Sequence, residues 1–278
     1  MLNHRLLLQY MNITSTDNRI VKLTASLAEK KYRDKEKLYI IEGPNLVREA
    51  LENGGRLRFI FTRAEQISSE AEAIAADAEE KGLAVYYASD NVFAKLSQTD
   101  NSQGILAVAE KELPSEAEFF ENCRGRNILV LDRIQDPGNM GTLLRTAEAA
   151  GMAGVVLTKG CVDPFSPKTV RASAGSVTRL PMFFADDAAQ TAALLKKAGK
   201  RLCVCVMNAD CVYWDADLSK DVAILIGNEG NGVSDEFISL ADIKIEIPME
   251  GRIESLNAGL AGGLVMYETM RQSKGALK

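Results

Sequence analysis

Histidine is almost missing from this 278-residue chain, which holds only His4. That residue falls in a segment that reads as a loose amino-terminal extension, residues 1–13. We therefore expect no Ser-His-Asp triad, no Cys-His pair and no histidine-based zinc site. An enzyme built from this chain must work with carboxylates, amides, hydroxyls, arginine and lysine, and the sequence predicts no metal centre.

Long apolar runs are missing too. No stretch of about 20 apolar residues occurs, so the sequence predicts no membrane span. The three-leucine run near the amino terminus is too short for the core of a secretion signal, and we expect a cytoplasmic protein. The five cysteines are odd in number and show no C-x-x-C spacing, so we expect reduced thiols.

Positive charge is in deficit, since 33 basic residues face 38 acidic ones. This balance argues against a protein that coats nucleic acid through a generally basic surface, but it leaves room for a local basic patch. A local surplus does occur between Arg19 and Lys37. Two interpretations stay open: a solvated face with basic residues at a helix carboxyl end, or a patch that contacts phosphate groups.

Predicted strands and helices alternate along most of the chain, which is typical of α/β proteins. We expect a first domain at 14–110, a charged and irregular linker at 111–126, and a second domain at 127–278. A first helix is expected to run to about Lys31. The second domain begins with a strand, 127–134, that is apolar on both faces, as strands of a buried parallel sheet are.

A glycine-rich segment, I-G-N-E-G-N-G-V-S at 226–234, joins a predicted strand to a predicted helix. Glycines let a backbone approach a ligand closely, and α/β proteins bind ligands at such passages. The segment lacks the G-K-[ST] ending of a P-loop. Glu229 would repel a phosphate, so the expected ligand carries amine or hydroxyl groups. A purely structural turn is the alternative.

The stretch from Ile245 onward ends a strand at Pro248 and leads into a long apolar helix, for which Ser255 is the expected N-cap. Three glycines lie inside that helix, at positions 259, 262 and 263. Glycine in a helix interior is less favourable than alanine by about 1 kcal/mol. We therefore expect another backbone to come close, and a buried core helix is the simpler interpretation.

Three segments read together resemble one family. D-P-x-N-x-G-x-x-x-R begins at Asp136, the glycine segment follows, and I-P-M-x-G-x-x-E-S-L-N comes last. In this order they resemble the SpoU family of RNA 2′-O-ribose methyltransferases, in the SPOUT superfamily, over residues 127–272. Residues 18–23 and 39–51 resemble the family's substrate-binding domain. The matching residues are Asn139, Gly141, Arg145, Gly227, Asn228, Glu229, Gly230, Pro248, Met249, Ser255, Leu256 and Asn257. After Asn257 the family often has Val-Ser where this chain has Ala258-Gly259, which should alter packing rather than chemistry.

The resemblance implies an α/β fold in two parts: a small amino-terminal domain of the L30e type, and a SPOUT domain with a mostly parallel sheet and a trefoil knot. It implies a homodimer through the carboxyl-terminal helix. It also implies S-adenosylmethionine as methyl donor, without a metal. The residues expected to hold this donor are Gly227, Ile247, Met249 and Leu256.

The resemblance also assigns catalytic roles, to Asn139, Arg145, Glu229, Ser255 and Asn257. A guanidinium does not readily lose its proton, so we expect Arg145 to orient a phosphate and stabilise a developing alkoxide, with base action left open. Glu229 is expected to pair with Arg145 or with its equivalent in a second subunit. Phosphate contacts are expected from Arg19, Lys22, Lys30, Lys31 and Arg33, with Lys168 and Arg171 as further candidates.

The expected substrate is ribosomal RNA. The same reaction on transfer RNA is the first alternative, and a non-catalytic RNA-binding factor is an alternative from another class. A nucleotide-dependent oxidoreductase is disfavoured because the chain has no dinucleotide fingerprint.

Overall fold

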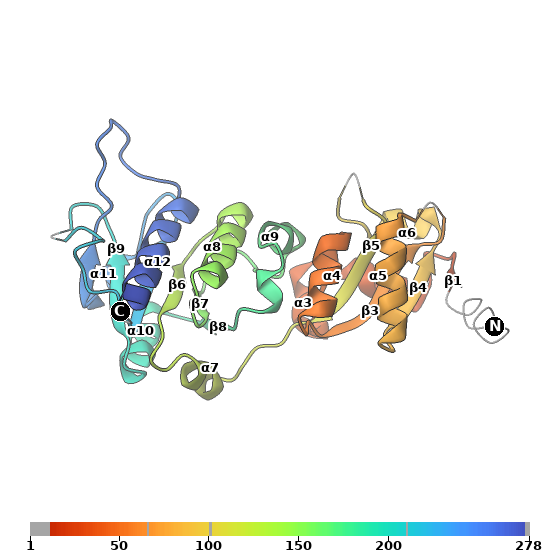
Figure 1. The fold of residues 1–278 in the computed structure, drawn as a ribbon, viewed down its shortest axis with the longest axis horizontal. Helices are drawn as coiled ribbons and strands as arrows, with labels where there is room; N and C mark the ends of the chain where they lie inside the picture. Colours follow the sequence, from red (N-terminus) through yellow and green to blue (C-terminus); the bar gives the residue numbers. More distant parts are fainter. Residues whose placement is uncertain (1–11, 66, 100–101, 210, 276–278) are drawn as a thin grey trace. The chain divides into compact units, whose positions relative to one another are not determined.

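The computed structural model describes residues 12–65, 67–99, 102–209 and 211–275. Contacts within the chain divide it into two compact units (Figure 1). Unit 1 holds the residues up to Glu112 together with Phe165–Thr178, and unit 2 holds Leu113–Pro164 and Arg179–Lys278. His4 and most of the predicted amino-terminal extension lie outside the described residues.

Unit 1 is built on a five-stranded sheet in the order β1-β4-β3-β5-β2, in which β1, β3 and β4 are parallel and β5 is antiparallel to both β3 and β2. Its strands are β1 (Asn12–Ile13), β2 (Leu38–Glu42), β3 (Leu57–Arg63), β4 (Ala84–Ala88) and β5 (Ile105–Glu110). Its helices are α2 (Arg19–Ser26), α3 (Lys30–Glu36), α4 (Pro44–Glu52), α5 (Ser69–Glu80), α6 (Asp90–Leu96) and α9 (Pro167–Ala172), followed by a 3₁₀ turn at Ser176–Thr178.

The amino-terminal part of unit 1 departs from the sequence prediction in two places. Residues 12–13, predicted to belong to a loose extension, form β1, and Ile13 is buried against the core. The single helix predicted to run to about Lys31 is two helices, α2 and α3. The Ser26 hydroxyl bonds to the Leu23 carbonyl, a local bond that competes with continued helix, and the chain turns at Leu27.

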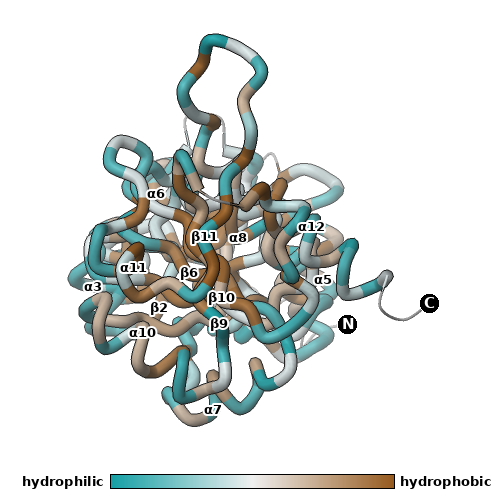
Figure 2. The backbone as a smooth tube through the Cα atoms, turned by 90° about the vertical axis from the view of Figure 1, so that its left-hand side faces the viewer, coloured by the Kyte–Doolittle hydropathy of each residue, from teal (hydrophilic) through white to brown (hydrophobic). Residues whose placement is uncertain are grey.

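Unit 2 is built on a six-stranded sheet in the order β11-β9-β10-β6-β7-β8, and every neighbouring pair is parallel. The mostly parallel sheet predicted for this domain is therefore confirmed. All residues of β6 are buried, as are all but the last of β10, and Figure 2 shows both strands as hydrophobic segments. The strands are β6 (Ile128–Asp132), β7 (Val155–Thr158), β8 (Met182–Ala185), β9 (Arg201–Cys205), β10 (Val222–Gly227) and β11 (Ile243–Ile245).

The helices of unit 2 are α7 (Glu116–Asn122), α8 (Pro137–Ala149), α10 (Ala188–Lys197), α11 (Asp235–Leu240) and α12 (Ala258–Gly275). Helix α7 lies inside the predicted linker, and a capping box between Ser115 and Glu118 stabilises its amino end. Helices α8 and α12 pack side by side, and α12 also contacts β10 (Figure 1). This pairing brings the start of α8 and the start of α12 close together.

The amino end of helix α12 differs from the prediction. It begins at Ala258, and its cap is Asn257 rather than Ser255, because the Asn257 Oδ1 accepts from the Leu260 N–H at 3.2 Å. Its glycines serve packing within the chain: a Cβ at Gly262 would lie 2.4 Å from Leu143 Cδ2, and one at Gly259 would lie 3.1 Å from Thr142 Cγ2. The simpler interpretation, close packing of a core helix, accounts for both positions.

Within the described ranges, no helix is long and apolar enough to cross a membrane. All five cysteines are free thiols, as predicted. Burial raises the pKa of Cys203 to about 12, so this thiol stays protonated at neutral pH.

Candidate active site

The three motif segments meet at one edge of the unit 2 sheet. Asp132 ends β6 and Gly227 ends β10, and the two residues are register partners on neighbouring parallel strands. The carboxyl ends of parallel strands are where open α/β sheets bind ligands. The segments that leave this edge are the start of α8, the loop 227–234 and the loop 246–257.

The glycine loop 227–234 turns back sharply on itself. Asn228 and Gly232 exchange backbone hydrogen bonds of 3.0 and 2.8 Å. A Cβ at Gly227 would lie 2.1 Å from the backbone carbon of Gly232 and from the Val233 nitrogen. Only glycine fits at position 227, because no real Cβ comes so near a backbone atom.

Glu229, inside this loop, reaches the start of α8. Its carboxylate accepts hydrogen bonds from the backbone N–H groups of Gln135 (3.2 Å) and Asp136 (3.1 Å), and from the Asn139 side-chain amide (3.0 Å). Partial burial acts to raise the Glu229 pKa, but the bonds donated by Asn139 and the backbone outweigh it, and the net pKa is lowered. Glu229 is therefore ionised at neutral pH.

Asn139 uses both ends of its side chain. Its Nδ2 donates to Glu229, and its Oδ1 accepts from the Asn257 Nδ2 at 2.7 Å. Asn257 is itself the cap of α12. One chain of side-chain hydrogen bonds thus joins Glu229, Asn139 and Asn257, which come from three segments far apart in the sequence.

Arg145 lies on α8 between one and two turns beyond Asn139, with an exposed side chain. Among the residues that the structure describes, no acid forms an ion pair with it. The predicted pairing of Glu229 with Arg145 of the same chain is not formed, because the Glu229 carboxylate is directed to Asn139 and the first turn of α8. Pairing with the equivalent arginine of a second subunit stays a prediction.

The loop 246–257 carries the remaining predicted site residues and extends away from the rest of unit 2 (Figures 1 and 2). Ser255 is exposed and, within the described part of the chain, its hydroxyl joins none of the bonds that link Asn139, Glu229 and Asn257. The predicted cofactor residues of this loop are half-buried: Ile247, Met249 and Leu256.

The basic residues predicted to contact RNA lie in unit 1. Arg19, Lys22, Lys30 and Lys31 are exposed. Three of the four have acidic neighbours, in the pairs Lys22–Asp17 (2.8 Å), Lys30–Asp34 (3.2 Å) and Lys31–Glu29 (3.0 Å). Exposed pairs of this kind are weak, so the lysines remain accessible to a stronger anion.

Arg33 does not fit the predicted RNA-contact set. It is 3% exposed, and its guanidinium donates to the Leu27 and Ala28 carbonyl oxygens at 2.7 and 2.8 Å. These carbonyls lie just beyond the carboxyl end of α2, where backbone carbonyls have no hydrogen-bond donor within the helix. The charge of Arg33 is therefore used inside unit 1, and we correct its assignment to a structural one.

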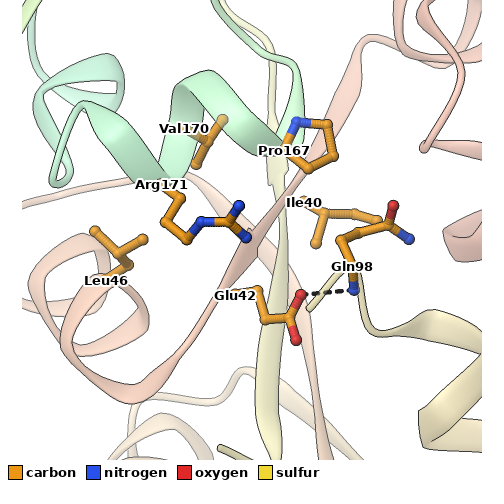
Figure 3. A pocket seen from close by; sticks show the side chains of 7 residues that line it. All are labelled: Ile40, Glu42, Leu46, Gln98, Pro167, Val170 and Arg171. Atoms are coloured by element: carbon orange, nitrogen blue, oxygen red, sulfur yellow. Dashed lines mark hydrogen bonds between the residues drawn. The ribbon is translucent and has the colours of Figure 1, made fainter. Parts of the chain in front are cut away.

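A small hollow in unit 1 lies between β2 and α9 (Figure 3). Glu42 and Arg171 point toward it, and the Glu42 carboxylate already accepts from the Gln98 N–H (2.8 Å) and the Thr99 hydroxyl (2.9 Å). Its cavity of about 10 Å³ has room for about one water molecule. It is too small for a substrate.

Asp132 is a buried acid at the motif edge that the sequence prediction did not single out. The signal was present, since a carboxylate closes the otherwise apolar strand I-L-V-L-D. A buried carboxylate needs hydrogen-bond donors around it, and the glycine loop provides one of them.

The chain is similar to known families and to known proteins. The SpoU rRNA methylase family matches residues 126–267, and an MRM3-like substrate binding domain matches residues 18–107. An uncharacterized tRNA/rRNA methyltransferase of Synechocystis is 35% identical over 265 residues, or 94% of each chain. The 23S rRNA (guanosine(2553)-2′-O)-methyltransferase RlmP of Bacillus subtilis is 33% identical over 92% of this chain and 97% of its own. The crystal structure of an AdoMet-bound rRNA methyltransferase from Sinorhizobium meliloti aligns with a TM-score of 0.81 and 32% identity, over 94% of this chain and 97% of that one.

Proposed function

This chain belongs to the SpoU rRNA methylase family, and we propose that it methylates the 2′-oxygen of a ribose in RNA, with S-adenosylmethionine as methyl donor. The observation that carries the proposal is the hydrogen-bonded chain Glu229–Asn139–Asn257. It brings one polar residue from each of the three motifs to the carboxyl edge of the parallel sheet, where such sheets bind ligands.

The residues at this edge fit the methyl donor. The tight turn at Gly227 holds the loop backbone at this edge, and Glu229 makes the same loop unsuitable for a phosphate group. Half-buried apolar side chains from the neighbouring loop suit an adenine or a thioether chain. Gly227, Ile247, Met249 and Leu256 would hold the donor, which supplies an electrophilic methyl group on a sulfonium when bound.

Chain residues must then prepare the ribose hydroxyl. Negative charge develops on its oxygen as the proton leaves to a base or to solvent, and this charge is consumed as the oxygen gains the methyl group. Arg145 is exposed and has no acidic partner in the described residues, so its guanidinium is available to a neighbouring phosphate and to the developing charge. Asn139, Asn257 and Ser255 position the ribose, while Glu229 holds Asn139. Positioning of this kind can supply about 7–11 kcal/mol of the barrier.

Ribosomal RNA is the substrate that we propose. The relative RlmP acts on 23S rRNA, and the substrate-binding domain would occupy residues 14–110, joined through 111–126 to a catalytic domain at 127–278. Phosphate contacts are assigned to Arg19, Lys22, Lys30 and Lys31. The same reaction on transfer RNA is the alternative, since the Synechocystis relative is named for both classes of RNA.

We also propose that the catalytic domain forms a homodimer through α12 and contains the trefoil knot of its superfamily. Two large apolar side chains on α12 support an interface, since Leu260 is 53% and Tyr267 48% exposed. They lie seven residues apart, so they share one face of the helix. We also propose a cytoplasmic location.

The proposal is tested by transfer of labelled methyl from S-adenosylmethionine to unmodified ribosomal RNA and, in parallel, to unmodified transfer RNA. The products are digested, and the nucleosides are identified by mass. We expect a 2′-O-methyl nucleoside from the ribosomal pool. Label on a base would contradict the ribose assignment, and a ribose product from transfer RNA alone would move the substrate to the alternative class.

A further inference from the structure

Asp132 gathers donors from three parts of unit 2. Its Oδ2 accepts from the Ser234 backbone N–H at 2.8 Å, and its Oδ1 accepts from the Thr158 hydroxyl at 3.2 Å. The Arg133 guanidinium donates to both carboxylate oxygens, at 3.2 and 3.3 Å. The Asp132 side chain is only 4% exposed. Hydrogen-bond donors reach both oxygens of this buried carboxylate.

These bonds hold the two ends of the glycine loop against the end of β6. Ser234 is where the loop enters α11, and its N–H is bound to Asp132. At the other end of the loop, the Asn228 Nδ2 donates to the Arg133 carbonyl at 2.9 Å. Asp132 therefore binds the end of the loop, and the adjacent residue Arg133 binds its beginning.

The backbone at Arg133 is itself constrained. Its φ is 56°, in the left-handed region that a side chain disfavours. Such a conformation persists only where the surroundings enforce it. Here Asp132 holds the guanidinium, the Thr158 hydroxyl accepts from the Arg133 N–H at 3.1 Å, and Asn228 holds the carbonyl.

We propose that Asp132 is a positioning residue for the methyl donor: it acts through Ser234 and Arg133 to keep the loop 227–234 in the shape that binds S-adenosylmethionine. This inference rests on the proposed function. It gives a role at the site to an acid outside the residues assigned to catalysis or to donor binding. Replacement of the carboxylate by an amide places an N–H₂ group among donors only, so at least one bond to the loop end or to Arg133 is lost.

The test compares Asp132→Asn with Asp221→Asn. Asp221 immediately precedes the amino end of β10, and its carboxylate accepts from the Lys200 ammonium at 2.8 Å. Loss of the Asp221 charge therefore weakens the same strand at the end far from the loop. Both variants should have a lower Tm than the wild-type protein. The affinity for S-adenosylmethionine, measured by calorimetry without RNA, should fall at least ~10-fold in Asp132→Asn only. Amide hydrogen exchange of a peptide covering 227–234 should likewise be faster only in that variant.

Thr158→Val keeps the shape of its side chain and removes both a donor to Asp132 and the acceptor of the Arg133 N–H. It serves if Asp132→Asn does not fold. We expect it to weaken donor binding as well, by less. Wild-type affinity in a folded Asp132→Asn would overturn the inference while leaving the proposed function intact. If Asp132→Asn does not fold, wild-type affinity in Thr158→Val would overturn it in the same way. Equal losses in Asp132→Asn and Asp221→Asn would also overturn it. A wild-type protein that binds no S-adenosylmethionine would refute the proposed function and the inference with it.

Discussion

No histidine is among the residues assigned to this site, so its chemistry depends on amide, carboxylate, hydroxyl and guanidinium side chains. Asn139 is central, because its amide donates to Glu229 and accepts from Asn257. The motif spacing predicted that these residues belong to one site, but it could not predict their partners. Glu229 binds Asn139 rather than Arg145, and Arg33 closes a helix end rather than facing RNA. Such choices depend on side-chain directions in the folded chain, which spacing does not contain.

Glu229→Gln tests the residue at the centre of these contacts. Three donors face the Glu229 carboxylate, and an amide can accept only through its oxygen, so we expect a loss of about 1 kcal/mol in the free energy of unfolding at neutral pH. Because the folded-state pKa of Glu229 is lowered, its contribution is complete above the ordinary glutamate pKa of about 4.3 and is lost as the pH falls through the lowered pKa. Urea unfolding of both proteins should give a constant difference between about pH 8 and about pH 5. A difference that closes within that range would count against the assignment.

At the scale of elements, the strands were easier to predict than the helix ends. An apolar run such as Ile128–Leu131 in β6 is typical of a strand in a buried parallel sheet. Ser255 and Asn257 are both good N-caps by propensity, and the fold selects Asn257, whose side chain is also bound to Asn139. The break between α2 and α3 likewise follows from a local Ser26 bond and from the buried Arg33, which the apolar spacing alone does not reveal.

The glycines of α12 provide a matched pair of substitutions. A Cβ at Gly262 would lie 2.4 Å from the buried Leu143 side chain, whereas one at Gly263 would meet Thr146 at an ordinary 3.6 Å. We expect Gly262→Ala to destabilise the protein by about 1–3 kcal/mol through overpacking. Gly263→Ala should be neutral or stabilise it by up to about 1 kcal/mol through helix propensity. Urea unfolding measures both, and equal effects would contradict the close packing of α12 on α8.

In the whole molecule, the two family matches cover two tasks, substrate binding and methyl transfer. The domain bounds expected from the sequence, 14–110 and 127–278, stay a prediction, and in the structure the segment Phe165–Thr178 packs in unit 1. Tyr39 and Phe165 meet there with ring centroids 4.9 Å apart. Sequence order could not show that the chain passes into unit 1 a second time.

Arg145 has an exposed guanidinium, and the proposed function gives this group a role only when RNA is bound. The most direct test is the single-turnover rate of methyl transfer by Arg145→Ala at saturating S-adenosylmethionine, with donor affinity measured by calorimetry. Arg124→Ala, which removes an exposed arginine paired with Glu121, is the control. We expect Arg145→Ala to lose at least ~100-fold in rate with unchanged donor affinity, and Arg124→Ala to keep both the rate and the affinity. A wild-type rate in Arg145→Ala would contradict it.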